Sequence, residues 1–264
     1  MVILLSFDIE EFDMPMEYGK SISLEEQIAI SNEGTNAVLD LLASEQIAAT
    51  FFCTAEFALY RPQTIKRIAN GIHEVASHGY YHSQFEFEHL ASSKKVLEDI
   101  SEKPINGYRM ARLKPLDLQA VTDAGYTYNS SLNPTYLPGR YNNFRKPRTM
   151  FEENGCLQLP VSVSPTLRIP LFWLAFHNFP VWYYRHLSKR TMMNDGYLNL
   201  YFHPWEFVDL NEKEQFGFPS YIRRCTGELM KTRFKEYLRW CKAQGYQFMT
   251  ISHYLATYHS QTPR

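Results

Sequence analysis

The sequence predicts an α/β fold whose parallel sheet curls into a barrel, open or closed. Short apolar runs typical of strands alternate along the chain with segments typical of helices, which is the pattern of repeated βα units. About seven such units fit into the 264 residues, and this number favours a barrel over a doubly wound sheet. No Gly-x-Gly-x-x-Gly follows the first run and no P-loop motif occurs, so nucleotide binding has no support.

The elements follow one another in a regular order. The first strand covers 2–10, and a helix over 24–44 follows it, with Ser23 and Glu26 forming a capping-box signature at its start. The next elements are a strand at 49–55, a helix from Pro62 to Gly71, a strand at 73–78, a helix at about 92–101 and a strand at 106–110. The second half holds a helix at 116–124, strands at 155–163 and 196–203, a helix at 231–243, and a last strand and helix within 246–255. We expect a single domain over residues 1–264.

Composition and charge narrow the class of function. The 27 basic and 28 acidic residues leave a net charge of −1, so we expect no nucleic-acid partner, because phosphate binding needs a basic excess. The N-terminal segment has no basic start, and no apolar run reaches the length of a membrane span. We therefore expect a cytoplasmic protein with no transmembrane span. The oligomeric state stays open, and a homo-oligomer is compatible with the sequence.

Side chains suited to chemistry lie at or just beyond the ends of the predicted strands. They are Asp8, Glu10, His78, His82, Arg109 and His203. In parallel α/β folds the active site lies at the carboxyl ends of the strands. Two carboxylates, three imidazoles and one guanidinium suit a divalent metal and a pair of proton-transfer groups.

Two pairs in this set have the spacing of metal ligands. Asp8 and Glu10 lie two residues apart on an extended segment, so both side chains leave the same face while Ile9 points the other way. A solvated acidic strand end is the alternative. His78 and His82 form a His-x-x-x-His pair, which on one helical turn can chelate one zinc ion. Two unrelated histidines on a loop are the alternative.

The remaining strand-end residues fit proton-transfer roles. Arg109 can hold and orient Asp8 as an ion pair, and we expect Arg112 to be an ordinary surface arginine. His203 ends a strand that Pro204 stops, which suits a general acid. A core histidine bonded to Glu206 is the alternative.

These residues fall within six short segments that follow one another along about residues 1–255. The segments are SFDIE (6–10), ATFF (49–52), SHGYYH (77–82), GYRMAR (107–112), DAGYTYNSSL (123–132) and LYFHPWEF (200–207). The series resembles the polysaccharide deacetylase family, also called the NodB-homology group or carbohydrate esterase family four, and within it the bacterial surface-polysaccharide branch. The resemblance implies a distorted, TIM-like (β/α)7 barrel. It also implies metal-dependent removal of an N-acetyl group from a sugar of a bacterial polysaccharide or its precursor.

The resemblance assigns a role to each of five residues. Asp8 matches the catalytic base, Arg109 the arginine that tethers the base, and His203 the catalytic acid. His78 and His82 match the two metal-binding imidazoles.

The carboxylate ligand departs from the family's pattern. The usual first motif, TFDD, carries its metal-binding aspartate where Ile9 stands, so Glu10 would take over that role, with Asp13 as a second choice. We expect one divalent metal ion, zinc foremost, with cobalt, nickel or manganese as alternatives.

Three residues are expected to contact a carbohydrate substrate. They are Tyr201, Trp205 and Met110. Tyr201 stands where the family's fifth motif has a leucine that shapes the acetyl pocket. The resemblance therefore implies a narrower pocket, or a different acyl group such as formyl. We also expect the backbone N–H after Arg109 to help hold the oxyanion of the reaction.

Two other functions stay open. The same fold could hydrolyse a non-glycan amide or a cyclic ureide, or it could be a catalytically inactive barrel that only binds glycan. Metal content and acid release from an N-acetyl glycan distinguish these alternatives.

A densely aromatic segment, 170–184, has no place in this scheme. We expect it to form a buried helix of the barrel, because apolar helical runs usually face a core. An interfacial or subunit surface is the alternative.

Overall fold

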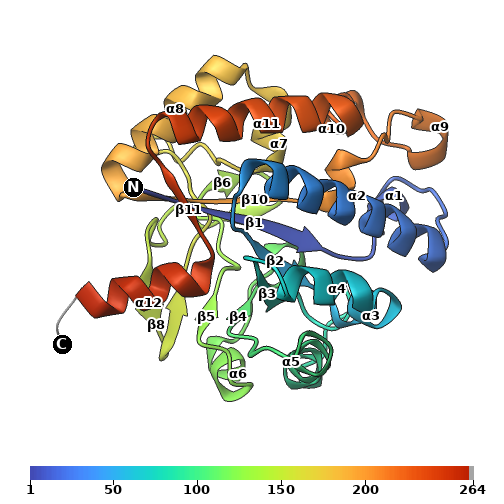
Figure 1. Cartoon of the computed structure of the whole chain (residues 1–264), viewed down its shortest axis with the longest axis horizontal. Coiled ribbons are helices and arrows are strands. Elements are labelled where there is room, and N and C mark those ends of the chain that lie inside the picture. The colour runs from blue at the N-terminus through green and yellow to red at the C-terminus, as the bar shows by residue number, and fades with distance from the viewer. Residues whose placement is uncertain (262–264) are drawn as a thin grey trace.

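The computed structural model describes residues 1–261, and its centre is a curled sheet (Figure 1). The strands follow the order β10–β1–β2–β3–β4–β5–β9–β8, and β11 pairs with the start of β1. Their bounds are β1 Val2–Ile9, β2 Thr50–Cys53, β3 Glu74–Ser77, β4 Gly107–Tyr108, β5 Tyr128–Asn129, β8 Phe151–Glu153, β9 Cys156–Gln158, β10 Tyr197–Phe202 and β11 Gln247–Met249. The pairs are parallel except that of β8 with β9. The predicted α/β class and the distorted (β/α)7 barrel are confirmed.

The barrel is distorted between β9 and β10, where an irregular segment replaces regular strand pairing. There the backbone N–H of Ser162 donates to the carbonyl of Asn199 (2.9 Å). The amide side chain of Asn199 donates to the carbonyls of Leu159 and Pro160, both at 3.1 Å. The predicted strand 155–163 is therefore regular only over β9, and Pro160 contributes to this because it has no N–H for a ladder bond.

Helices cover the outer side of the sheet, with α2, α8 and α11 on one side of β1 and α3, α4 and α5 on the other (Figure 1). Their bounds are α1 Met14–Glu17, α2 Leu24–Glu45, α3 Ala55–Tyr60, α4 Pro62–Ala69, α5 Glu88–Ser101, α6 Leu118–Asp123, α7 Trp173–Asn178, α8 Val181–Asp195, α9 Lys213–Phe216, α10 Ser220–Arg223, α11 Gly227–Ala243 and α12 Ile251–Gln261. Two 3₁₀ turns, η1 Ala111–Leu113 and η2 Pro204–Phe207, follow β4 and β10, and a small hairpin joins β6 Tyr136–Leu137 to β7 Tyr141–Asn142. The long predicted helices are present, and Ser23 caps α2 by accepting from the N–H of Glu26 (3.2 Å).

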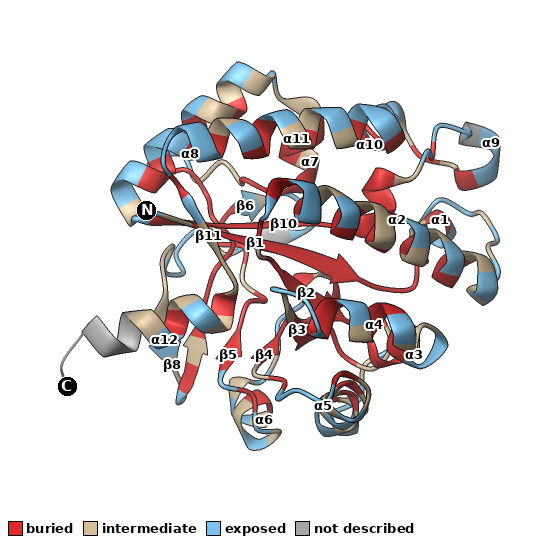
Figure 2. Cartoon of the chain, viewed as in Figure 1, coloured by how far each residue is buried: buried red, intermediate tan, exposed pale blue. Residues whose placement is uncertain are grey.

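Strand β1 is buried along nearly its whole length (Figure 2). Its odd-numbered side chains, from Ile3 to Ile9, belong to the large core cluster shared with the helices. Leu4 belongs instead to a second cluster inside the barrel. Because side chains alternate along a strand, Asp8 and Glu10 point to the barrel side and Ile9 to the helices. The predicted orientation of Ile9, which is fully buried, is confirmed.

A glycine in α2 lets η2 approach closely. A Cβ at Gly34 would lie 2.0 Å from the carbonyl oxygen of Pro204, so no larger residue fits without moving the backbone. This glycine costs about 1 kcal/mol of helix propensity relative to alanine. The close approach carries Trp205 and Glu206 toward the end of β1.

The aromatic segment 170–184 divides into α7 and the start of α8. Trp173 and Phe176 of α7 are buried as expected, whereas Trp182 in the first turn of α8 is 72% exposed. Among residues 1–261, no helix is both long enough and apolar enough to cross a membrane.

Candidate active site

A cavity lies where β1, the loop after β3 and the end of β10 meet. Asp8, Glu10, His78, His82, Tyr201 and His203, all predicted site residues, line it. Asp13, Glu17, Tyr18, Arg112, Trp173 and Tyr221 are further lining residues. The fold therefore brings the predicted strand-end residues together in one cavity, although Asp8 and His203 are 195 residues apart in the sequence.

Asp8 is held by a fully buried arginine. The Nη1 of Arg109 donates to the Oδ1 of Asp8 (2.6 Å), and its other bonds go to Ser6 and Ser130. The guanidinium carbon also lies 4.0 Å from the centroid of the Phe52 ring. With every polar nitrogen of Arg109 occupied, Asp8 has a fixed orientation at the wall of the cavity.

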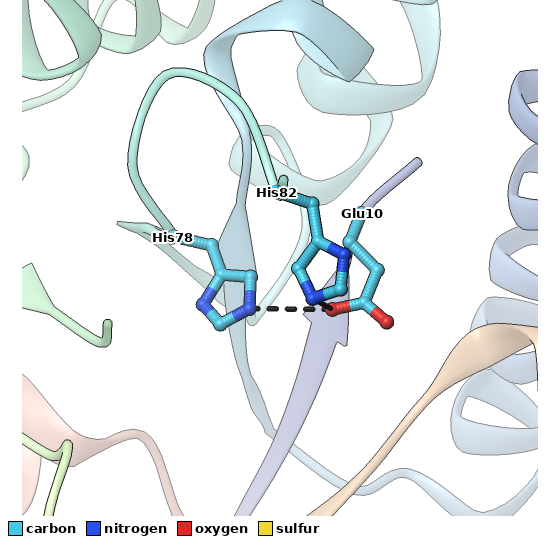
Figure 3. Close-up of side chains that lie close together, drawn as sticks. All are labelled: Glu10, His78 and His82. Carbon is cyan, nitrogen blue, oxygen red and sulfur yellow. Dashed lines mark ion pairs between the residues drawn. The ribbon is translucent and has the colours of Figure 1, made fainter. Parts of the chain in front are cut away.

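Glu10, His78 and His82 converge on one point (Figure 3). The Oε2 of Glu10 lies 2.9 Å from the Nε2 of His82 and 3.3 Å from the Nε2 of His78. All three side chains are buried. A carboxylate oxygen and two imidazole nitrogens at this spacing can hold one divalent ion.

The two histidines are on a loop and not on the helical turn that their spacing would suit. Gly79 has a φ of +92°, a left-handed conformation that breaks any helix at this point. The carboxylate of Glu11 holds the loop instead, because its Oε2 accepts from the backbone N–H of His82 (2.9 Å). Its Oε1 accepts from the hydroxyl of Thr54 (2.9 Å) at the end of β2. The loop still brings the two Nε2 atoms together.

The hydrogen bonds of the two rings fit a metal ion. The Nδ1 of His78 lies 2.9 Å from the carbonyl oxygen of Arg109, and the Nδ1 of His82 lies 2.9 Å from the Oδ1 of Asp13. Because these oxygens accept, each Nδ1 carries a proton, and the Nε2 that lies beside Glu10 is the nitrogen of each ring that is available to an ion. Asp13, the second-choice ligand, therefore supports His82 rather than joining Glu10.

The cluster attracts positive charge. Burial alone would raise the pKa of Glu10, but the imidazoles of His82 and His203 hold that pKa well below its usual range. Burial alone would lower the pKa of His82, but the carboxylates of Glu10 and Asp13 raise it to about 10. Either a proton or a divalent cation can balance the negative charge of the carboxylates. The two Nε2 atoms and the carboxylate of Glu10 are also suitable ligands for a divalent cation.

His203 lies on the other side of the cavity and is bound to Glu206. Its Nδ1 lies 3.1 Å from the Oε1 of Glu206, whose Oε2 lies 2.7 Å from the Nε2 of His177 in α7. Burial alone would raise the pKa of Glu206, but the two imidazoles hold it below its usual value. Burial alone would lower the pKa of His203, but Glu10 and Glu206 raise it. His203 thus both lines the cavity and bonds to Glu206, as the two sequence interpretations separately suggested.

Two of the three expected substrate contacts do not line the cavity. Trp205 is fully buried, and its Nε1 points to the Oε1 of Glu10 at 3.4 Å. Met110 lies behind the wall, and its N–H donates to the hydroxyl of Ser131 (2.8 Å). The N–H that follows Arg109 is therefore engaged, which corrects the expectation that it holds an oxyanion. Tyr201 does line the cavity.

Arg112 contradicts its expected place on the surface. It lines the cavity and donates to the carboxylates of Asp13 (3.0 Å) and Glu17 (2.8 Å). Sequence patterns did not point to this contact, because Asp13 and Arg112 are 99 residues apart and both lie outside regular strands. No sequence pattern indicated that His177 would bond to Glu206, since His177 lies within an aromatic segment whose composition is typical of a buried helix.

Comparisons with known proteins agree with this geometry. Residues 2–128 match the sequence model of the family described as polysaccharide deacetylase. Over 84 residues the chain is 29% identical to the peptidoglycan-N-acetylmuramic acid deacetylase PdaA of Bacillus subtilis (strain 168). That stretch covers 32% of this chain and 32% of the length of the curated relative.

Two solved structures share the fold over nearly the whole chain. A putative polysaccharide deacetylase from Mycobacterium smegmatis superimposes with a TM-score of 0.68 at 18% identity, covering 100% of this chain and 92% of that one. The structure of Puue allantoinase superimposes with a TM-score of 0.68 at 15% identity, covering 100% of this chain and 91% of that one. Identities this low establish the fold only, and the two neighbours bear names of different activities.

Proposed function

We propose that this chain, whose residues 2–128 match the sequence model of the polysaccharide deacetylase family, hydrolyses the N-acetyl group of a sugar in a bacterial polysaccharide or its precursor. The observation that carries the proposal is the meeting of three parts in one cavity. These parts are the tethered carboxylate of Asp8, the Glu10–His78–His82 cluster and the imidazole of His203. A base, a Lewis acid and an acid in one site are the groups that metal-assisted amide hydrolysis uses.

Glu10, His78 and His82 would hold one divalent ion, with zinc as the first candidate. Such an ion, when bound, polarises an acyl oxygen and makes water easier to deprotonate. The chain would fix the positions of the three ligands, because Trp205 bonds to Glu10 and each histidine Nδ1 bonds to an oxygen of the chain.

Asp8 and His203 would move the protons. Arg109 occupies the Oδ1 of Asp8, so the other carboxylate oxygen accepts the proton of water as that water attacks the acyl carbon. Glu206 occupies the Nδ1 of His203, so its Nε2 donates a proton to the amine as the carbon–nitrogen bond breaks. The products are a carboxylic acid and a free amino sugar. Asp8 and His203 line the same cavity, which supports their acting on one substrate.

The aromatic lining supports a carbohydrate substrate. Tyr18 and Tyr221 lie at the cavity and are 37% and 46% exposed, so part of each side chain is accessible to a sugar ring. Tyr201 lies deeper and is buried, where it would limit the size of the acyl group. We therefore include N-formyl sugars beside N-acetyl sugars in the test below.

A substrate screen tests the proposal. Zinc-loaded protein is incubated with N-acetylated glycan fragments, with N-formyl sugars and with allantoin, a cyclic ureide, and released acid and free amine are measured. We expect acid and amine in equal amounts from an N-acyl sugar and no opening of the ureide. Ureide opening without acid release would favour the non-glycan hydrolase, and the absence of both reactions would favour the inactive, glycan-binding barrel.

Glu206 is expected to set the alkaline limit of activity. His203 must carry a proton to act as the acid, and Glu10 and Glu206 both raise its pKa against the effect of burial, so activity extends to higher pH. In Glu206→Gln the pKa of His203 falls, and the alkaline limb of the kcat/KM profile moves to lower pH. The profile of the variant is measured beside that of Glu212→Gln, an exposed glutamate. An alkaline limb that stays in place or moves upward would refute this role of Glu206.

A further inference from the structure

We propose that Arg112 is a positioning residue of the ion site, which acts by locking Asp13 onto the metal-facing histidine His82. This inference rests on the proposed ion site and concerns how the chain builds it. None of the six motif segments assigns such a role to Arg112, which the sequence pattern placed on the surface.

Arg112 makes three hydrogen bonds around His82. Its Nη2 donates to the Oδ2 of Asp13 (3.0 Å), its Nη1 to the carbonyl oxygen of His82 (3.1 Å) and its Nε to the Oε1 of Glu17 (2.8 Å). One planar guanidinium therefore links the segment after β1 to the His-x-x-x-His loop. A lysine could not reproduce this fork, because its single ammonium group has no fixed plane.

The backbone is bent to deliver this side chain. Arg112 and Leu113 have φ values of +57° and +50°, so two successive residues other than glycine are left-handed. Such a conformation is unfavourable and persists where surrounding contacts hold it. The three bonds of Arg112 are contacts of that kind.

Asp13 transmits the effect to His82. One carboxylate oxygen, Oδ2, is taken by Arg112, and the other, Oδ1, faces the Nδ1 of His82 at 2.9 Å. This bond occupies the Nδ1 of His82, so Nε2, which lies 2.9 Å from Glu10, is the ring nitrogen that is available to an ion. Without Arg112, Asp13 could rotate, and both the ring and its proton would lose their fixed positions.

His78 provides an internal contrast. Its Nδ1 is held by the backbone carbonyl of Arg109, and no side-chain substitution removes that oxygen. Loss of Arg112 should therefore loosen one of the two imidazole ligands and leave the other in place. The expected result is weaker ion binding rather than no ion binding.

Metal affinity of the stripped protein is the decisive measurement. The wild type, Arg112→Ala, Arg112→Lys and Asp13→Asn are freed of metal, and zinc dissociation constants are measured by competition with a chromophoric chelator. Cobalt absorption spectra of the same proteins report the ligand geometry. Removal of such supporting partners typically costs about 10–100-fold in metal affinity, and we expect this loss in Arg112→Ala and Asp13→Asn. The double variant should lose little more than either single one, and Arg112→Lys should fall between.

Two controls separate positioning from a general effect on folding. Glu25→Gln removes an exposed carboxylate and Arg145→Ala removes an exposed arginine, both away from the cavity, so both variants should bind zinc as the wild type does. Thermal unfolding of the stripped proteins checks that each variant is folded. Should Arg112→Ala fail to fold, Arg112→Lys and Asp13→Asn carry the test.

The outcomes distinguish the inference from the proposed function. The role of Arg112 would be overturned if the folded Arg112→Ala and Asp13→Asn variants had the zinc affinity and the cobalt spectra of the wild type. If Arg112→Ala does not fold, the same result in Arg112→Lys and Asp13→Asn would overturn it. In both cases the proposed ion site would remain. A wild type that binds no zinc would overturn the ion site itself.

Discussion

Replacing Asp8 by Asn should lower kcat/KM by about 10²–10⁴-fold, the usual contribution of a general base. Asparagine keeps the shape of Asp8 and an oxygen that can accept from Arg109, but it cannot take a proton from water. Zinc binding should stay close to that of the wild type, because Asp8 is not among the three residues of the cluster. Initial rates on the N-acyl sugar found in the screen, together with zinc affinity, measure both effects.

The same variant should lose stability, because it leaves the buried charge of Arg109 without a counter-ion. Breaking a buried ion pair costs up to about 3–5 kcal/mol, and the remaining acceptor makes the loss smaller here. Urea unfolding measures it, with Asp40→Asn as a control, since Asp40 forms an exposed pair with Arg67. A folded Asp8→Asn protein with the activity of the wild type would show that another group is the base.

Replacing His203 by Gln should also lower amide hydrolysis by about 10²–10⁴-fold. The reason is different, because His203 is assigned to the leaving amine rather than to water. An activated aryl ester of the same acid has a leaving group that needs no proton, so its hydrolysis should fall far less. Asp8→Asn should slow both substrates alike.

This contrast makes the assignment of the acid testable by rates alone. Glutamine retains a hydrogen-bonding group beside Glu206, and His186→Gln in α8 is a matched exposed control. Equal losses on the amide and the ester in His203→Gln would argue that His203 acts in the first step, and no loss on the amide would remove it from the reaction.

The sequence predicted the grouping of the strand-end residues better than it predicted the details of the fold. Alternating strands and helices place strand ends at one edge, so the residue pattern alone was enough to group Asp8, Glu10, His78, His82 and His203. The i, i+2 spacing on β1 correctly separated Glu10 from Ile9, because strand periodicity is strict.

Features that depend on loops and long-range contacts were not predictable. The spacing of His78 and His82 suggested a helix, whereas Gly79 adopts a left-handed conformation that only the folded loop reveals. Arg112 reaches Asp13 through a strained turn, and periodicity gives no signal for such a turn. Pro160 does indicate that the strand expected at 155–163 cannot pair regularly along its whole length, because proline has no N–H to donate.

The first experiment is to measure the metal content of protein purified without chelator, beside His78→Ala and His82→Ala. We expect close to one divalent ion per chain in the wild type, and loss of this ion in both variants. We also expect the stripped wild type to regain activity when zinc is restored. A wild type that holds no ion, even after soaking with zinc, would refute the proposed ion site, because Glu10 would then not replace the aspartate missing at Ile9.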